Sequence, residues 1–195
     1  MNSTTLLARQ LASGQPSRPT ALDAFKLARR QFMSGQRIEM QPLAQELGVS
    51  RVTLHRWVGS RDQLLGEVLW SLGRPTFDHA RARVTHRGGK AVAETMENFL
   101  TDVLAAPFMR TFLEREAEIA LRILTTSRSS FQANFVNYIG ELISAEMKDR
   151  PIPLDLDDLA YLVTRIGESF FYVDIIAGGQ PDPHKAGQAI AALLA

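Results

Sequence analysis

The sequence contains no cysteine and no uninterrupted apolar stretch long enough to cross a membrane. Without cysteine the chain can form neither disulfides nor thiolate metal sites. A membrane-spanning helix needs about 18 or more consecutive apolar residues, and none is present. Residues 1–20 lack the basic start and the apolar core of a signal peptide. We therefore expect a cytoplasmic protein without a membrane partner.

Catalytic and metal-binding motifs are also absent. The histidines, His55, His79, His86 and His184, form no HExxH pair and do not stand with carboxylates at metal-ligand spacing. The chain has no GxSxG elbow and no Walker-type phosphate loop. The acidic segment DLDD at 155–158 lacks an EF-hand register and is suited to capping a helix. The sequence thus predicts no enzyme, no metal and no cofactor.

The charge is divided unevenly along the chain. Residues 1–90 carry 14 Lys and Arg against 6 Asp and Glu, a net of +8, whereas residues 91–195 carry 8 against 15, a net of −7. A basic first half favours an anionic partner such as nucleic acid, and an acidic second half suggests a separate task. Chance segregation of surface charge is the alternative interpretation.

Apolar residues recur at helical spacing along most of the chain, and no segment alternates as a strand would. Capping residues, glycines and prolines divide the chain into nine predicted helices. Pro75 is expected to kink or break the fourth of them. Residues 1–19, rich in Ser, Thr, Gly, Gln and Pro, are expected to form a flexible arm. The predicted helices lie at about residues 20–34, 40–48, 49–57, 60–84, 91–106, 108–126, 129–149, 155–178 and 184–195.

The stretch GVSRVTLHRWVGSRDQ at 48–63 predicts a helix-turn-helix unit, in which two short helices meet at Gly48 and a third packs behind them. Its apolar positions have the spacing needed to share one small core. The remaining side chains of 50–57 then face outward. This predicts an all-α fold with a helix-turn-helix domain at 20–66 and a second helical domain at 67–195. The predicted core positions are Ile38, Leu43, Ala44, Leu47, Val49, Leu54 and Val58.

The outward side chains of 50–57 suit a recognition helix that enters the major groove with its N-terminal end forward. Arg51 or Arg56 can make a bidentate contact to a guanine edge, worth ~1–3 kcal/mol of discrimination. Arg61, in the first turn of the next helix, is expected to contact a phosphate. Trp57 can pack in the core instead, and a plain charged surface helix is the alternative for the whole stretch. The residues predicted to touch DNA are Ser50, Arg51, Thr53, His55, Arg56, Trp57 and Arg61.

The segment LAQELGVSRVTLHRWVGSRDQLL resembles the DNA-binding motif of TetR-type transcriptional regulators. The match lies in Leu43-Ala44, Gly48-Val49-Ser50 and Thr53-Leu54, and the motif covers residues 20–72. Four positions depart from the family pattern. His55 replaces the usual tyrosine, Trp57 the usual histidine or tyrosine, Val58 the usual phenylalanine and Arg61 the usual lysine.

The resemblance implies an all-helical protein of about nine helices that forms a homodimer through its last two long helices. It also implies a DNA contact from Gln41 or its neighbour, at the start of the second helix of the motif. The segments FLEREAEIALRILTT and RIGESFFYVDIIAGGQPDP look like the QsdR-type branch, whose name refers to quorum-signal degradation. That resemblance implies control of genes for the breakdown of lactone or related signals.

The predicted helix 155–178 has three faces at helical spacing. An apolar stripe through Leu162 and Ile166 is expected to be core. A polar and aromatic stripe contains Arg165, which can hold a ligand carbonyl or carboxylate, or pair with Glu168 on the surface. A stripe of mainly small residues suits close helix crossing and is assigned to the dimer interface, with packing inside one chain as the alternative. This third stripe consists of Ala160, Thr164, Gly167, Phe171 and Gly178.

Aromatic residues of the second domain are candidates for an apolar effector cavity, although such residues more often form plain core. The residues predicted to bind an effector are Phe99, Met109, Phe112, Phe131, Phe135, Tyr138, Arg165 and Tyr172.

We therefore predict a homodimeric repressor that binds a palindromic, double-stranded DNA operator and releases it when a small apolar or amphipathic ligand binds, of the lactone or fatty-acyl type. The alternatives are an architectural DNA-binding protein without an effector and a helical lipid-binding protein.

Overall fold

The structure, a computed structural model, describes residues 18–148, 151–152 and 154–195. Within these ranges it contains eleven α-helices and no strand, so the predicted all-α fold class is confirmed. Most of the predicted N-terminal arm, residues 1–17, lies outside the described residues.

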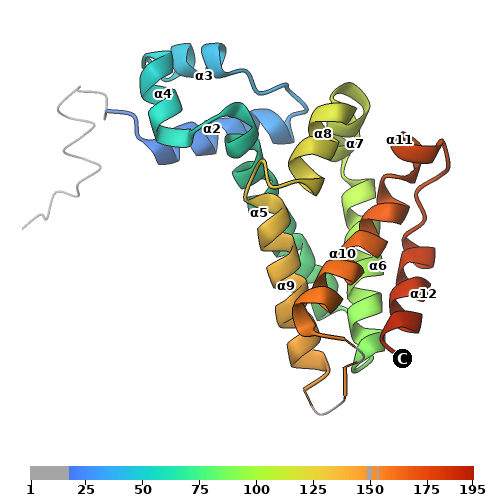
Figure 1. Cartoon of the computed structure of the whole chain (residues 1–195). Helices are drawn as coiled ribbons and strands as arrows, with labels where there is room; N and C mark the ends of the chain where they lie inside the picture. The colour runs from blue at the N-terminus through green and yellow to red at the C-terminus, as the bar shows by residue number, and fades with distance from the viewer. Residues whose placement is uncertain (1–17, 149–150, 153) are drawn as a thin grey trace, which may run out of the picture.

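The first three helices form the helix-turn-helix end of the molecule (Figure 1). They are α2 (Ala21–Met33), α3 (Met40–Glu46) and α4 (Arg51–Val58). The Thr20 hydroxyl caps α2 and the Ser50 hydroxyl caps α4, each accepting a hydrogen bond from a backbone N–H three residues on. Gly48, with φ of 66°, turns the chain between α3 and α4. The buried Ile38, Leu43, Ala44 and Leu54 confirm the predicted core, and Leu47, Val49 and Val58 pack against it half-buried.

The long helix α5 (Arg61–Ala82) connects this end to a C-terminal bundle (Figure 1). In the bundle α6 packs on α5, α9 and α12, and α10 packs on α9 and α12. Two short helices, α7 and α8, lie between the bundle and the helix-turn-helix end. The bounds are α6 (Gly89–Ala105), α7 (Pro107–Arg115), α8 (Ala117–Thr125), α9 (Phe131–Glu146), α10 (Leu156–Phe171), α11 (Val173–Ala177) and α12 (Pro183–Leu193).

Helix α5 continues through Pro75, so the expected break at this proline does not occur. Proline removes one backbone donor, but Pro75 is exposed, so water can hydrate the carbonyl that loses its partner. The buried residues Gly73 and Phe77 hold the helix against the bundle on both sides of the proline. Tertiary packing thus outweighs the local cost of the proline.

The count rises from nine predicted helices to eleven because two of them are interrupted. Residues 108–126 divide into α7 and α8 at Glu116, where φ is −134° and ψ is 41°. Residues 155–178 divide into α10 and α11 at Tyr172, where φ is −98° and ψ is 14°. Neither break contains glycine or proline. Both break residues instead have side chains engaged in tertiary contacts, Glu116 with arginines and Tyr172 in the core.

Candidate DNA-reading surface and effector cavity

The outward face of α4 is the candidate DNA-reading surface. Leu54 is fully buried and Val58 is half-buried, so this side of α4 is anchored in the helix-turn-helix core. Val52 and Arg56 are exposed and one helical turn apart, on the opposite side. The Ser50 hydroxyl accepts from the Thr53 N–H over 3.0 Å and fixes the N-terminal end of the helix.

Most residues predicted to touch DNA are accessible. Gln41, Ser50, Arg51, His55 and Arg56 are exposed, and Thr53 is half-buried with its hydroxyl oxygen 2.9 Å from that of Ser50. No ion pair with any residue in the described ranges engages Arg51 or Arg56. Both guanidinium groups therefore keep their donors for a base or phosphate.

Arg61 does not have the accessible side chain that the predicted phosphate contact requires. Its side chain is only 16% exposed, and its Nη2 lies 2.6 Å from Glu116 Oε2. Its Nε donates to the Ile38 carbonyl over 2.5 Å. The guanidinium group thus ties the first turn of α5 to the junction of α7 and α8. In this arrangement Arg61 has a structural role, and its phosphate contact stays a prediction.

Trp57 is half-buried and packs against the core. It also lines a surface groove between α2, α4 and the α8–α9 connection, together with Phe25 and Ser129. The structure therefore places Trp57 in the packing role that the sequence left open as the alternative to a DNA contact.

Sequence reasoning missed Val52, whose side chain is 79% exposed. An exposed valine on a recognition helix offers methyl groups to a thymine methyl. The signal was available in the sequence, because Val52 lies two residues before the core residue Leu54 and so cannot share its face of a helix.

The candidate effector cavity consists of two small spaces of about 60 and 30 Å³ inside the C-terminal bundle. Both are lined by Phe99, Val103, Met109 and Phe131, so a shift of these side chains would join them. Sequence reasoning missed Gly73, which lines the larger space from α5. Glycine inside a helix costs about 1 kcal/mol relative to alanine, and that cost is a sequence signal for a packing constraint.

The smaller space has a polar end formed by Glu168 and Tyr172. The Glu168 side chain is 7% exposed and accepts from Arg165 Nη1 over 2.6 Å. The side-chain amide of Gln132 lies 2.9 Å from Glu168 Oε1. Burial raises the pKa of Tyr172 well above its ordinary value, so its phenol stays protonated and can donate a hydrogen bond. The smaller space therefore combines apolar walls with one carboxyl group and one hydroxyl group. The larger space is also lined by Thr76 and Asp102.

Burial also raises the pKa of Glu168 above its ordinary value near 4.5, although the Arg165 guanidinium opposes the shift. The folded protein therefore holds this proton more tightly than the unfolded chain, and stability is lost as pH rises from about 4.5 through the folded-state pKa. We expect Glu168→Gln to remove this loss. Denaturant unfolding over that pH range should show the variant gaining stability relative to wild type as pH rises.

Glu141→Gln is the matched control, because Glu141 is an exposed glutamate of the neighbouring helix α9. This variant should follow the wild-type pH dependence. A Glu168→Gln curve parallel to wild type would contradict a raised pKa at Glu168.

The eight residues predicted to bind an effector are divided by the structure. Phe99, Met109, Phe131, Phe135 and Tyr172 line the two spaces. Arg165 forms the ion pair with Glu168 that the sequence offered as its alternative role. Phe112 and Tyr138 do not line these spaces. Phe112 faces a cleft between α2 and α7, and the Tyr138 hydroxyl donates a hydrogen bond of 3.0 Å to Asp78.

The small-residue stripe predicted as the dimer interface lies inside the monomer instead. Ala160, Thr164 and Phe171 are at most 5% exposed. Gly167 packs against Met96 of α6, where an added Cβ would lie 3.1 Å from the sulfur. Gly178 is not on this stripe, because it ends α11 with φ of 67°. Small residues indicate close helix contact, but here the contact is within one chain, so the assignment of Ala160, Thr164, Gly167 and Phe171 to the dimer interface is wrong. Gly178 is exposed, and its place in the interface stays a prediction.

Among the described residues, no group of three His, Asp or Glu is arranged to hold a metal ion. No helix among the same residues has both the length and the apolar character needed to cross a membrane.

A family model for the C-terminal domain of tetracyclin repressor-like proteins matches residues 87–195. The fold is similar to that of the R. erythropolis transcriptional repressor QsdR from the TetR family, with a TM-score of 0.82 and 24% identity over 89% of this chain and 93% of that chain. It is also similar to the TetR family repressor AlkX from Dietzia sp. strain DQ12-45-1b, implicated in biodegradation of n-alkanes, with a TM-score of 0.56 and 20% identity over 91% of this chain and 95% of that chain. No curated protein matches the sequence. Because the family model spans more than half of the residues and follows a helix-turn-helix domain, the chain belongs to the TetR family of transcriptional regulators.

Proposed function

We propose that the protein is a homodimeric repressor that acts in the cytoplasm, binds a palindromic operator and releases it when a small ligand binds. Residues 20–66 read DNA, and residues 67–195 bind the effector and form the dimer. The observation that carries the proposal is the outward face of α4, where Val52 and Arg56 are exposed on a helix anchored by Leu54. Two such helices in a symmetric dimer read half-sites about one or more helical turns apart.

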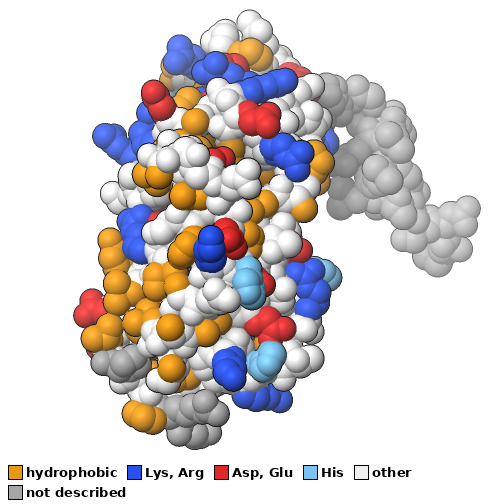
Figure 2. Space-filling model, turned by 90° about the vertical axis from the view of Figure 1, so that its right-hand side faces the viewer, with side chains coloured by type: hydrophobic (Ala, Val, Ile, Leu, Met, Phe, Trp, Pro, Cys, Tyr) orange, Lys and Arg blue, Asp and Glu red, His pale blue; other side chains and the backbone are white. Residues whose placement is uncertain are grey.

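The exposed face of α10 is the proposed dimer surface. It carries Leu162, which is 36% exposed, with the half-buried Ile166 and Phe170 at helical spacing after it. Figure 2 views the right-hand side of Figure 1, where α10, α11 and α12 lie, and hydrophobic side chains gather over the left part of its lower half, beside charged side chains on the right. This is the stripe that the sequence pattern assigned to the core. Exposed apolar patches of this kind favour a protein partner, and a two-fold dimer brings the same patch from both subunits together.

Leu162→Asp is expected to shift the protein toward monomer, because each dimer would bury two aspartates against an apolar surface. We expect the dimer dissociation constant to rise by about 100-fold, which corresponds to about 2.7 kcal/mol. Sedimentation velocity over a concentration series measures this constant. Met33→Asp, at a 45% exposed site of α2, should leave the dimer unchanged. Equal sedimentation of wild type and Leu162→Asp would rule out this face of α10 as the interface.

The proposed effector is small, mainly apolar and uncharged. The Glu168 carboxyl lines the cavity, and a negative ligand beside it would be repelled or would have to meet it protonated. A lactone fits this environment better than a free fatty acid. Its ester oxygens accept a hydrogen bond from the protonated Tyr172 phenol, and its hydrocarbon part meets the phenylalanine walls.

The size of the two spaces means that an effector must open the bundle. Cavities of about 60 and 30 Å³ are far below the ~300–1,000 Å³ of sites for drug-sized ligands. Met109 lines both spaces and is flexible enough to yield. The same small volumes favour the second candidate function, an architectural DNA-binding protein without an effector.

The first experiment selects operators from a random duplex library and titrates the best sequence by fluorescence anisotropy. We expect a palindromic sequence bound by an even number of chains. An aliphatic γ-lactone should then release the DNA, whereas the salt of its ring-opened hydroxy acid should not. Selection without release by any lactone would support the architectural function, and no enriched sequence would contradict sequence-specific regulation.

A further inference from the structure

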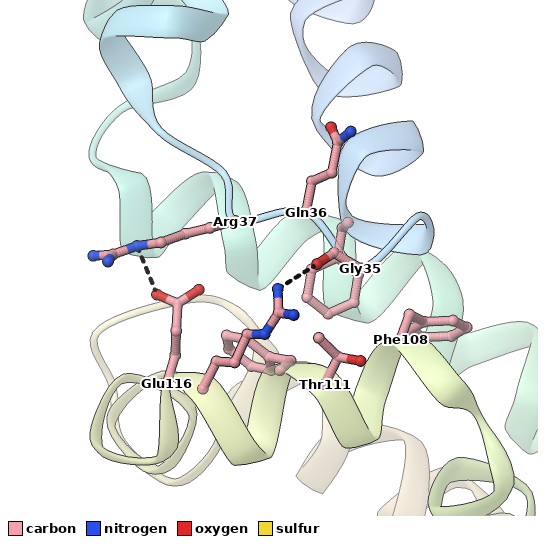
Figure 3. A pocket seen from close by; sticks show the side chains of 9 residues that line it. Gly35, Gln36, Arg37, Phe108, Thr111 and Glu116 are labelled. Atoms are coloured by element: carbon pink, nitrogen blue, oxygen red, sulfur yellow. Dashed lines mark hydrogen bonds and ion pairs between the residues drawn. The ribbon is translucent and has the colours of Figure 1, made fainter.

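We propose that a cleft at the junction of the two domains is a separate binding site for a small aromatic carboxylate. The cleft measures about 230 Å³ and lies between the α2–α3 connection and α7. Figure 3 shows the side chains that line it from both sides: Arg37 extends from the connection toward Glu116, and Phe108 and Thr111 come from α7. The cleft is distinct from the cavity inside the bundle, although Phe108 lines both.

Three phenylalanine rings supply the apolar side of the cleft. Phe32 of α2 makes edge contacts with Phe108 and Phe112 of α7, with ring centroids 5.7 and 5.3 Å apart. Aromatic rings prefer such edge or offset contacts, so a flat aromatic ligand can extend the cluster. Residues of both domains thus contribute to one aromatic surface.

Two arginines supply the cationic rim. Arg115 Nη1 lies 3.4 Å from the Gly35 carbonyl, at the outer limit for a hydrogen bond, and the Arg115 side chain is exposed. Arg37 uses its Nε toward Glu39 at 2.7 Å and Glu116 at 3.4 Å. Each guanidinium has five N–H donors in a planar fork that matches a carboxylate, so both keep donors for a ligand.

The local charges leave room for one more negative group. Arg37 and Arg61 are paired with two carboxylates, Glu39 and Glu116. Among the described residues Arg115 approaches only the Gly35 carbonyl, so these five side chains carry a net charge of +1. Arg61 already pairs closely with Glu116, and the Glu116 carboxylate would repel a second anion. We therefore place the ligand carboxylate on the Arg115 side of the cleft. A ligand carboxylate there would complete the charge balance.

The volume limits the ligand to a small molecule. The cleft of about 230 Å³ is below the ~300–1,000 Å³ of sites for drug-sized ligands, so a single ring with its carboxylate is the size class that fits. The chemistry is also opposite to that of the bundle cavity, where the Glu168 carboxyl disfavours an anion. The two sites therefore select different ligands.

The test is isothermal titration of the full chain with benzoate, without DNA, so that its outcome does not depend on operator binding. We expect saturable binding of benzoate and at least tenfold weaker binding of benzamide, which keeps the ring and the shape but lacks the charge. Cyclohexanecarboxylate and inorganic phosphate should also bind at least tenfold more weakly, since the first loses the aromatic contacts and the second has no ring.

Arg115→Gln should weaken benzoate binding at least tenfold, and circular dichroism should show an unchanged fold because Arg115 is exposed. Arg110→Gln is the matched control, since Arg110 is an exposed arginine of the same helix outside the cleft. The proposal is overturned if benzoate does not saturate, if benzamide or phosphate binds as well as benzoate, or if the two variants lose equal affinity.

Discussion

Arg61→Ala is expected to lower the free energy of unfolding by about 3 kcal/mol. The Glu116 side chain is 8% exposed, and its closest partner is Arg61 Nη2 at 2.6 Å. Removing one partner of a buried ion pair leaves a charge without compensation, which typically costs about 3–5 kcal/mol. We expect the lower end of this range because Arg37 Nε, 3.4 Å from Glu116, would still partly compensate its charge. Guanidinium or urea unfolding at neutral pH measures the loss.

Arg122→Ala is the control for this prediction. Arg122 also joins α8 to the first turn of α5, through Asp62 at 2.9 Å, but its side chain is 45% exposed. Water screens this pair, so the variant should lose much less stability than Arg61→Ala. If Arg61→Ala kept its stability and instead weakened binding to all DNA with a shallower salt dependence, Arg61 would be the phosphate contact that the sequence suggested.

The second large effect is expected on DNA discrimination. Arg56→Ala should reduce the preference for the selected operator over random duplex by about 2–6 kcal/mol. A dimer loses one contact in each half-site, and a bidentate contact to guanine is worth ~1–3 kcal/mol. Binding to random DNA, which depends on phosphate contacts, should change far less. Anisotropy titrations of both duplexes at one salt concentration give the ratio.

Arg30→Ala is suited as the control, because Arg30 is an exposed arginine of α2 in the same domain but not on α4. It should leave the ratio between operator and random DNA unchanged. Equal losses on both duplexes from Arg56→Ala would show that Arg56 contacts the backbone and that the outward face of α4 does not read bases through it.

The interdomain ion pairs also suggest how the two domains communicate. Glu116 stands at the break between α7 and α8, and Met109 of α7 lines the proposed effector cavity. A ligand that displaces Met109 would therefore act on the helix that ends at the Arg61–Glu116 pair. A ligand shifts the equilibrium between two conformations only as far as its affinities for them differ. The Arg61–Glu116 ion pair is a contact that can differ between these conformations.

The sequence by itself determined the local features of this protein. The caps at Thr20, Ser50 and Ser60 and the turn at Gly48 follow from short-range hydrogen bonding and backbone freedom, so they could be predicted. The helix-turn-helix core followed from apolar spacing for the same reason. The exposed residues of α4 belong to this class too, because one buried anchor at Leu54 orients the whole short helix.

Tertiary structure alone decided which surface each longer helix presents. Helix α10 carries an apolar stripe and a small-residue stripe, and each suits close packing. Helical periodicity alone does not show which of the two is buried. Gly167 allows Met96 of α6 to pack closely against α10, so the small-residue stripe is buried and Leu162 remains exposed. Arg61 likewise looked like a free cation, since its partner Glu116 lies 55 residues away. Local sequence determines helices and caps because their hydrogen bonds are local, whereas burial and ion pairing depend on residues that only the folded chain brings together.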